Sequence, residues 1–390
     1  MSVQLFSKIP LAWLQLTRNK VRLLVALMGI TFASVLIFMQ LAFLDSLYDS
    51  QTALHRSLKA DLILINPEMK TLASKRNFSR QHLYRALNFD QVTSINYIYH
   101  GQRSFKYEGN TGGKGIIIVG INPEDPPFKI PDFDQVVSRL RTTGTVLFDQ
   151  NSDLNEYGNI VQDLQSGKPI TAEVGERKVW VGGTVDFAGA SFADDGNLIV
   201  SAASYLQIFS HQNADDITIG LITLKPGVDK QIFLQQLATQ LPENVQVMTL
   251  QDFIDLEKHY WSTSAPIGFV FGMGVLVGFL VGVIIVYQIL YNEVSDHLPD
   301  YAVLKARGYK HRYFLGILFQ EALLLALLGY IPGFAISLGL YDVTKNATAL
   351  PIHMTFQRAV LVLLLNIMMC FMSGAISMSK LREADPAELF

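Results

Sequence analysis

The chain has 390 residues, of which 50% are hydrophobic and only 17% are charged. Soluble domains carry about 25% charged residues, so this composition predicts a membrane protein. The formal net charge of -3 offers no basic surplus for nucleic acid, and the single cysteine, Cys370, excludes a disulfide framework and a cysteine-based metal site.

Residues 1–20 precede the first apolar run and contain Trp13 among several leucines. Such a segment suits the lipid interface, so we expect a cytoplasmic interfacial helix; an ordinary positively charged flank is the alternative. The apolar run that follows is too long for a signal peptide, and no small-residue cleavage pattern comes after it. We therefore expect a retained anchor.

Four apolar segments are long enough to cross a bilayer, which takes about 20 residues in a helix. These predicted transmembrane helices cover residues 21–44, 266–291, 315–340 and 359–379.

Basic residues gather in three flanking segments, and all three fall on the same side of a four-span path. The segments are 1–22, the loop 292–314 and the tail 380–390. Basic flanks stay in the cytoplasm, so we expect both termini there. Residues 45–265 and the short loop 341–358 then lie outside the cytoplasm.

The outside segment 45–265 is large enough for a core of its own, and it looks mixed. We predict an α+β domain of one or two subdomains. The predicted strands are 60–67, 112–125, 177–187, 196–203 and 216–227, and the predicted helices are 79–88, 229–240 and 251–262.

Small residues recur every four positions in the second span, including Gly274, Gly278 and Gly282. This spacing places them on one helix face, where backbones can approach closely. A dimer seam and packing against the first or third span are both compatible with the pattern.

The third span contains a charge, Glu321, and a proline, Pro332, between Gly329 and Gly333. A charge near mid-membrane costs about 2.5–3.5 kcal/mol, so Glu321 is either a hinge group partnered by another helix or a side chain reaching the nearby interface. Pro332 should kink the helix.

The loop 292–314 contains the complete short helix "LPDYAVLKARG". Pro299 suits its first position and Gly308 its left-handed end, while acidic and basic residues match the helix dipole. An exposed apolar knob at the cytoplasmic surface suggests a partner protein, although a merely well-capped loop would look similar. The proposed contact residues are Asp300, Tyr301, Ala302, Val303, Leu304, Lys305, Ala306, Arg307 and Gly308.

No catalytic motif is evident. The fragments "TGGKG" and "SGKP" fail the spacing of an ATP-binding P-loop, and no histidine pair has metal-ligand spacing. We predict no enzyme activity, no metal and no cofactor in this chain.

The stretch "NEVSDHLPDYAVLKARGYKHRYFLGILFQEALLLALLGYIPG" resembles the signature of MacB/FtsX-type permeases of ABC transporters. "LAWLQLTRNKVRLLVALMGI" and "LREADPAELF" resemble the family's two ends. Within the family, "SDHLPDYAVLKARGY" and "TLKPGVDKQIFLQQLATQLPENVQVMTLQDF" look most like the cyanobacterial DevC-type permeases. Members of the family generally carry a basic residue near the position of His297, and this sequence departs from that pattern. The matching positions are Glu293, Ala302, Leu304, Lys305, Ala306, Gly308, Glu321, Gly329, Gly333, Arg382, Pro386, Ala387, Glu388 and Leu389.

The resemblance implies a homodimer carrying two ABC ATPase subunits, which hold ATP and Mg²⁺. Segment 299–308 would be the coupling helix, and ATP-driven motion would reach the periplasmic domain without substrate passing between the membrane helices. A periplasmic membrane-fusion adaptor, an outer-membrane channel and glycolipid cargo would complete an exporter. The main alternative is an FtsX-like regulator that activates a periplasmic cell-wall hydrolase without transport; lipoprotein release to a carrier and a membrane-anchored enzyme are further readings.

Overall fold

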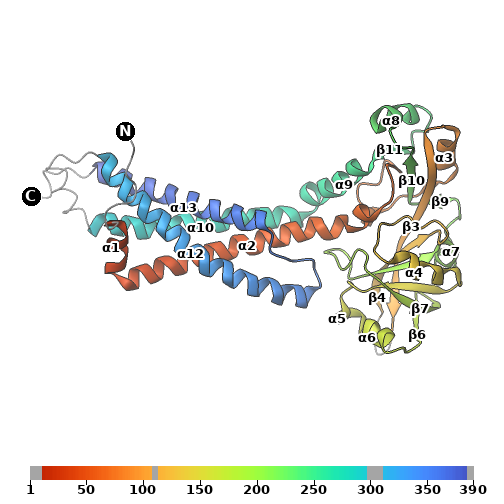
Figure 1. Cartoon of the computed structure of the whole chain (residues 1–390), viewed down its shortest axis with the longest axis horizontal. Helices are drawn as coiled ribbons and strands as arrows, with labels where there is room; N and C mark the ends of the chain where they lie inside the picture. Colours follow the sequence, from red (N-terminus) through yellow and green to blue (C-terminus); the bar gives the residue numbers. More distant parts are fainter. Residues whose placement is uncertain (1–10, 108–112, 297–310, 384–390) are drawn as a thin grey trace, which may run out of the picture. The chain divides into compact units, whose positions relative to one another are not determined.

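The computed structural model describes residues 11–107, 113–296 and 311–383, which form two compact units. We call the first the membrane unit; it comprises Met1–Asp45, Phe269–Val343 and Ile352–Phe390. The second, the sheet domain, comprises Ser46–Gly268 and Thr344–Pro351. Figure 1 labels their helices and strands.

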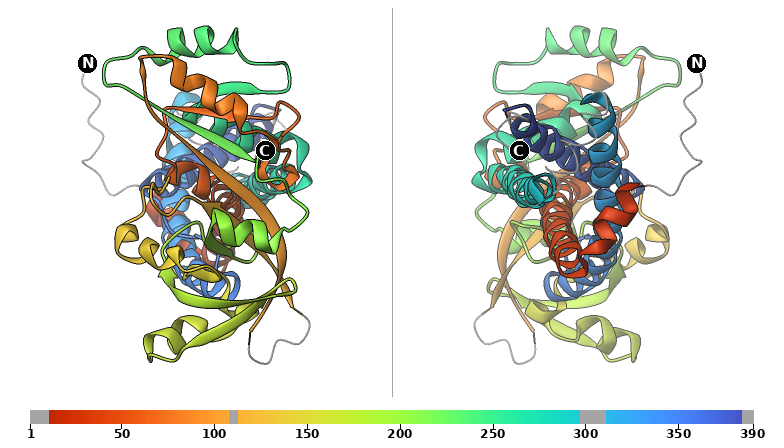
Figure 2. Two further views of the ribbon diagram at one scale, coloured as in Figure 1. Left: turned by 90° about the vertical axis from the view of Figure 1, so that its right-hand side faces the viewer. Right: turned by 90° about the vertical axis from the view of Figure 1, so that its left-hand side faces the viewer.

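Four long helices dominate the membrane unit, and Figure 2 (right) shows them nearly end-on as a bundle. Each contains a stretch apolar enough to cross a membrane, so the chain is a multi-pass membrane protein. A short helix, α1, precedes them. The helices are α1 Leu11–Arg18, α2 Lys20–Ser57, α10 Pro266–Asp296, α12 His311–Thr348 and α13 Phe356–Glu383.

Several helices run past the predicted spans. α2 continues beyond residue 44 to Ser57, and α12 runs beyond residue 340 to Thr348. An apolar run identifies only the part of a helix that lies in the hydrocarbon of the membrane. The helix itself can continue through polar residues, because its backbone hydrogen bonds do not depend on side-chain polarity. Asn19 starts α2 by accepting the Arg22 backbone N–H at 3.2 Å, and Ala349, with φ +54°, follows the end of α12 in the left-handed conformation.

The sheet domain is built on a nine-stranded sheet in the order β11-β1-β10-β3-β4-β8-β5-β7-β6, with a further pairing of β3 with β6. This pairing closes the strands from β3 to β6 into a ring. Among the described strands, β4–β8 and β5–β7 pair in parallel, and the other pairs are antiparallel. The strands are β1 Leu62–Ile65, β3 Val92–Lys106, β4 Lys114–Ile121, β5 Thr145–Asp149, β6 Ile170–Val174, β7 Arg177–Val185, β8 Asn197–Ser201, β10 Ile219–Leu224 and β11 Gln246–Thr249, with a separate pair β2 Phe78–Ser79 and β9 Asp216–Ile217.

Strand β3 belongs to both parts of the sheet. Its first half pairs with β10 from Val92 to Ile98, and its second half pairs with β4 from Tyr99 to Phe105. The α+β class is confirmed, and the two halves of the domain share one continuous strand rather than forming separate subdomains.

Side chains alternate between two apolar clusters on opposite faces of the strands. In β1, Leu62 and Leu64 enter one cluster, while Ile63 and Ile65 enter the other. This is the two-residue period expected of strands that are buried on both faces.

Short helices cover the sheet, and each of the three predicted helical stretches contains one, with different bounds. Of the predicted stretch 79–88, only residues 81–84 are α-helical, and a 3₁₀ turn follows them. Asp229 caps α8, and Thr249 with Asp252 forms a capping box on α9. Residues 202–203, predicted as strand, instead begin α7, because Ser201 Oγ caps that helix. The helices are α3 Gln81–Tyr84, α4 Phe133–Val137, α5 Leu154–Tyr157, α6 Ile160–Gln165, α7 Ala202–Ile208, α8 Lys230–Ala238 and α9 Leu250–His259; 3₁₀ turns span Leu72–Ser74, Arg85–Asn88 and Ser138–Arg141, and a π turn spans Tyr260–Ser264.

Candidate functional site

The predicted coupling helix falls outside the described residues, which stop at Asp296 and resume at His311. Its nine proposed contact residues, Asp300 to Gly308, therefore remain a prediction.

An ion-pair cluster ties α2 to the last turn of α10, directly before that segment. Arg22 Nη1 lies 3.1 Å from Glu293 Oε2, and Arg22 Nη2 lies 2.6 Å from Asp296 Oδ2. The Glu293 side chain is only 8% exposed, so its contact with Arg22 is largely shielded from solvent on the carboxylate side. The two helices are thus linked at the end that borders the predicted coupling segment.

The three predicted packing glycines of α10 face other helices of the same chain. A methyl group at Gly278 would lie 3.2 Å from Ile37 Cγ1 of α2. One at Gly282 would collide with the Met369 side chain of α13 and would lie 2.9 Å from Ala33 Cβ of α2. At Gly274 it would meet the side chain of Gln40. Small residues therefore let α10 approach α2 closely, as in other membrane helix pairs.

The glycines of α12 approach α2 in the same way. A methyl group at Gly329 would lie 2.5 Å from Ile30 Cγ2, and one at Gly333 would lie 2.7 Å from Ser34 Cβ. Pro332 lies between them, within an α12 that continues to Thr348. Helix α2 is therefore in close contact with both α10 and α12.

Hydrogen bonds between the helices reinforce this packing. Asn366 Nδ2 of α13 donates to Ser34 Oγ of α2 at 2.7 Å, and Ser373 Oγ donates to the Val283 carbonyl of α10 at 2.8 Å. In hydrocarbon, such bonds add about 0.6 kcal/mol each to helix association.

Glu321 lies within the apolar core of the bundle. Its side chain is fully buried, and among the described residues neither carboxylate oxygen has a hydrogen-bond partner. Its neighbours on α12, Leu318, Ala322 and Leu325, belong to that core. The side chain therefore does not extend to solvent at the interface.

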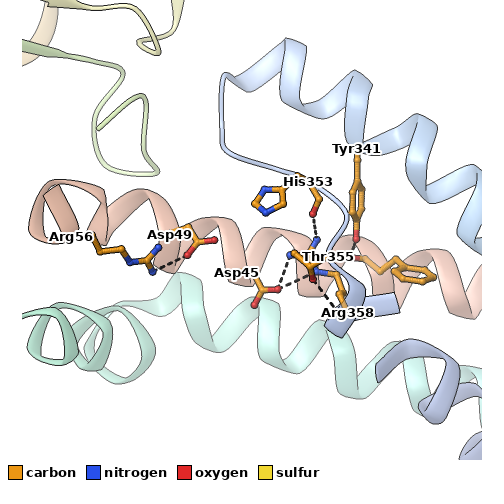
Figure 3. A network of polar contacts seen from close by, with 8 residues as sticks. Asp45, Asp49, Arg56, Tyr341, His353, Thr355 and Arg358 are labelled. Carbon is orange, nitrogen blue, oxygen red and sulfur yellow. Dashed lines mark hydrogen bonds and ion pairs between the residues drawn. The ribbon is translucent and has the colours of Figure 1, made fainter. Parts of the chain in front are cut away.

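A second polar network, shown in Figure 3, joins the start of α13 to α2 and α12. Arg358 Nε and Nη2 donate to Asp45 Oδ2 at 3.1 and 2.6 Å, and Arg358 Nη1 donates to the His353 carbonyl at 2.8 Å. The guanidinium also lies 5.5 Å from the ring centroid of Tyr341, whose hydroxyl donates to the Phe38 carbonyl at 2.7 Å. One buried arginine thus fixes three helices at this end of the bundle.

A comparison with known protein families places the C-terminal region. Residues 265–386 match the family described as FtsX-like permease C-terminal. This region is therefore similar to FtsX-like permeases. It contains α10, α12 and α13 together with the segment predicted to couple to an ATPase.

Solved structures with limited similarity to this chain were also found. The periplasmic region of MacB from Actinobacillus actinomycetemcomitans has a TM-score of 0.34 at 12% identity, covering 51% of this chain and 92% of that one. The extracellular domain of the noncanonic ABC-type transporter YknZ from Gram-positive bacteria has a TM-score of 0.31 at 15% identity, covering 49% and 100%.

The Arg358–Asp45 pair was not predicted from the sequence. Asp45 ends the first apolar run and Arg358 opens the last, but the two lie 313 positions apart. The sequence does place these opposite charges at the ends of two predicted spans that lie on the same side of the membrane, and this placement could have indicated the pair. Among the described residues, no group of three or more His, Cys, Asp or Glu side chains could hold a metal ion.

Proposed function

We propose that this chain is the permease subunit of an ABC-type export system and transmits motion from a separate cytoplasmic ATPase to the sheet domain. The observation that carries this proposal is the FtsX-like permease match over residues 265–386, because it includes the predicted coupling segment.

The contacts of α2 support a mechanical role. Arg22 ties its start to the last turn of α10, while Ile30, Ser34 and Ile37 pack against the close-approach glycines. α2 then continues as one helix to Ser57, and Leu54 belongs to the core of the sheet domain. Packed helices shift between discrete arrangements rather than deforming continuously, so displacement of α10 or α12 by the ATPase would carry α2 with it.

In this proposal the ATPase binds ATP and Mg²⁺, and this chain needs no cofactor of its own. The side carrying residues 297–310 and both termini is cytoplasmic, and the sheet domain is periplasmic, as the basic flanks favour. Two copies of the chain form the working unit, with one ATPase subunit on each.

We further propose a periplasmic adaptor, an outer-membrane channel and envelope glycolipid as cargo. This step rests on the resemblance of residues 295–309 and 223–253 to DevC-type permeases. Cells lacking the chain should lose the glycolipid from the outer envelope and retain it at the inner membrane, as measured by lipid analysis of separated membranes.

Purification of the tagged chain from native membranes in mild detergent tests the proposal. We expect a stoichiometric ABC ATPase together with an adaptor protein. An ATPase recovered with a peptidoglycan hydrolase would instead support an FtsX-like regulator, and absence of any ATPase would refute both.

A further inference from the structure

A small polar cavity lies within the sheet domain, where the end of α2, strands β3, β4 and β8, the loop before β8, and α9 meet. Its volume is about 50 Å³. Leu54 and Ile117 form apolar parts of its wall. Its principal polar lining residues are Gln51, His100, Ser191, Asp194, Asn197 and Glu257. The cavity is too small for a sugar ring or a lipid chain, but it can hold a group of a few heavy atoms.

A buried carboxylate fixes one wall of the cavity. Asp149 accepts the backbone N–H groups of Phe187 at 3.2 Å and Gly189 at 2.6 Å, and it accepts Asn197 Nδ2 at 3.0 Å. Asn197 Nδ2 also donates to the Gly189 carbonyl at 2.8 Å. Both amide hydrogens of Asn197 are thereby used within the wall, so its side chain can offer the cavity only an acceptor oxygen.

Glu257 also lines the cavity and is held equally firmly. It accepts hydrogen bonds from Thr71 Oγ1 at 2.6 Å, the Leu72 backbone N–H at 2.9 Å and Trp261 Nε1 at 2.8 Å. Burial alone would raise the pKa of Glu257, but contacts with His55, Thr71 and Leu72 lower it below its ordinary value. The carboxylate is therefore charged at neutral pH.

Asp194 adds a second carboxylate. Gln102 Nε2 donates to its Oδ1 at 2.8 Å, and among the described residues Oδ2 has no hydrogen-bond partner. Burial and the adjacent Asp195 raise the pKa of Asp194 to about 6, so it remains mostly ionised at pH 7. None of the residues that line the cavity is a lysine or arginine.

Two further lining groups lack partners. His100 is 5% exposed and its Nδ1 has no hydrogen-bond partner, while Gln51 Nε2 is an unpartnered donor. Burial and the nearby charge of Lys75 lower the pKa of His100 to about 3, so its imidazole is neutral and retains an acceptor nitrogen. The cavity thus combines negative charge with a buried imidazole that can accept a hydrogen bond.

We propose that this cavity binds a primary ammonium group on a short alkyl stem. The ammonium, with three donors, would be held by Asp194, the Asn197 amide oxygen and the His100 imidazole, and the stem would lie against Leu54 and Ile117. A lysine side chain of a partner protein and the ethanolamine headgroup of a lipid both carry this chemistry. The inference does not depend on the proposed export function.

Protection of an introduced cysteine tests the site in the full-length protein. Cys370 is the native cysteine, so Cys370→Ala provides the background and Ser191→Cys places a thiol on the cavity wall. Labelling by a neutral methanethiosulfonate reagent is then measured while ethylammonium is titrated. At ten times its Kd, ethylammonium should slow labelling about tenfold. Ethanol and acetate, its neutral and anionic counterparts, should not.

Matched variants identify the group responsible. Asp194→Asn should abolish protection by ethylammonium, because the substitution removes the negative charge. The asparagine side chain can still accept the hydrogen bond from Gln102, so the local structure should be kept. Asp195→Asn should retain protection, because Asp195 does not line the cavity. A cysteine at the exposed turn residue Ser166, placed in each variant, should be labelled at one rate throughout if the fold is intact.

The pH dependence provides a second readout. Asp194 lies next to Asp195 on its own loop and lines the cavity together with His100 of β3 and Glu257 of α9. Near pH 6 His100 stays neutral and Glu257 stays charged, so Asp194 is the lining group that titrates there. Protection should therefore weaken as pH falls below about 6. Glycerophosphoethanolamine and Nα-acetyl-lysine amide distinguish the two sources of the ammonium by which of them protects at the lower concentration. Equal protection by ethanol, protection by acetate, or no protection by any of these amines would overturn the proposal.

Discussion

The Arg358–Asp45 pair allows a directional prediction, because its two partners differ in burial. The Arg358 side chain is 4% exposed, whereas that of Asp45 is 48% exposed. Removing the carboxylate leaves a buried guanidinium without its counter-ion. Removing the guanidinium leaves a carboxylate that water can reach. We therefore expect Asp45→Asn to destabilise the chain more than Arg358→Met.

The expected magnitude follows from that asymmetry. Breaking a fully buried pair costs about 3–5 kcal/mol, and an exposed pair contributes about 0–1 kcal/mol. With one partner half exposed, we expect Asp45→Asn to cost about 2–3 kcal/mol. Arg358→Met should cost about 1–2 kcal/mol, mainly because the His353 carbonyl loses its donor.

The measurement is reversible unfolding of the purified protein in mixed detergent micelles, with the double variant included to complete a thermodynamic cycle. The double variant should be more stable than Asp45→Asn alone, because no unpaired cation remains. An Asp45→Asn cost equal to or smaller than that of Arg358→Met, or strictly additive costs, would refute the assignment of a coupled buried pair.

Three further predictions address other parts of the chain. Leu304→Glu should abolish stimulation of the partner ATPase while the protein still inserts in the membrane; normal stimulation in this variant would argue against a coupling helix. Gly329→Ile should destabilise the bundle by about 1–3 kcal/mol, because the new side chain meets Ile30, whereas Gly339→Ala, with no atom within 4 Å, should be nearly neutral; equal unfolding free energies would contradict the packing. Burial and the nearby charge of Lys75 lower the pKa of His100 to about 3, so the unfolded chain binds this proton before the folded chain does as pH falls below about 6.5. The unfolding free energy should therefore decrease by about 1.4 kcal/mol per pH unit more than it does in the His100→Gln variant. Parallel pH profiles for the two proteins would show that His100 does not contribute.

The membrane helices and several domain elements were predictable because their signals are local. A helix that crosses a membrane needs a long apolar run, which is visible in the sequence. The starts of α8 and α9 are marked by the N-cap residues Asp229 and Thr249. The close-approach role of Gly278 and Gly282 was also visible as spacing. The helix that packs against these glycines could not be predicted, because glycine spacing identifies one face of a helix but not the element that contacts that face.

The remaining features depend on contacts between distant residues. Strand β3 was missed because its sequence, "VTSINYIYHGQRSFK", alternates poorly and changes partners at Ile98. The Arg358–Asp45 pair and the cavity around Asp194 and Glu257 join residues from separate elements. No window of neighbouring positions contains these contacts, so only the folded chain reveals them.

Transmission of ATPase motion to the sheet domain is the central claim, and a distance measurement tests it most directly. Spin labels on Ser166→Cys, in a Cys370→Ala background, would report the separation of two sheet domains in a reconstituted complex with a hydrolysis-deficient ATPase. We predict that ATP shifts the distance distribution and that Leu304→Glu removes the shift. An unchanged distribution when ATP is bound to the assembled complex would contradict transmission through this chain.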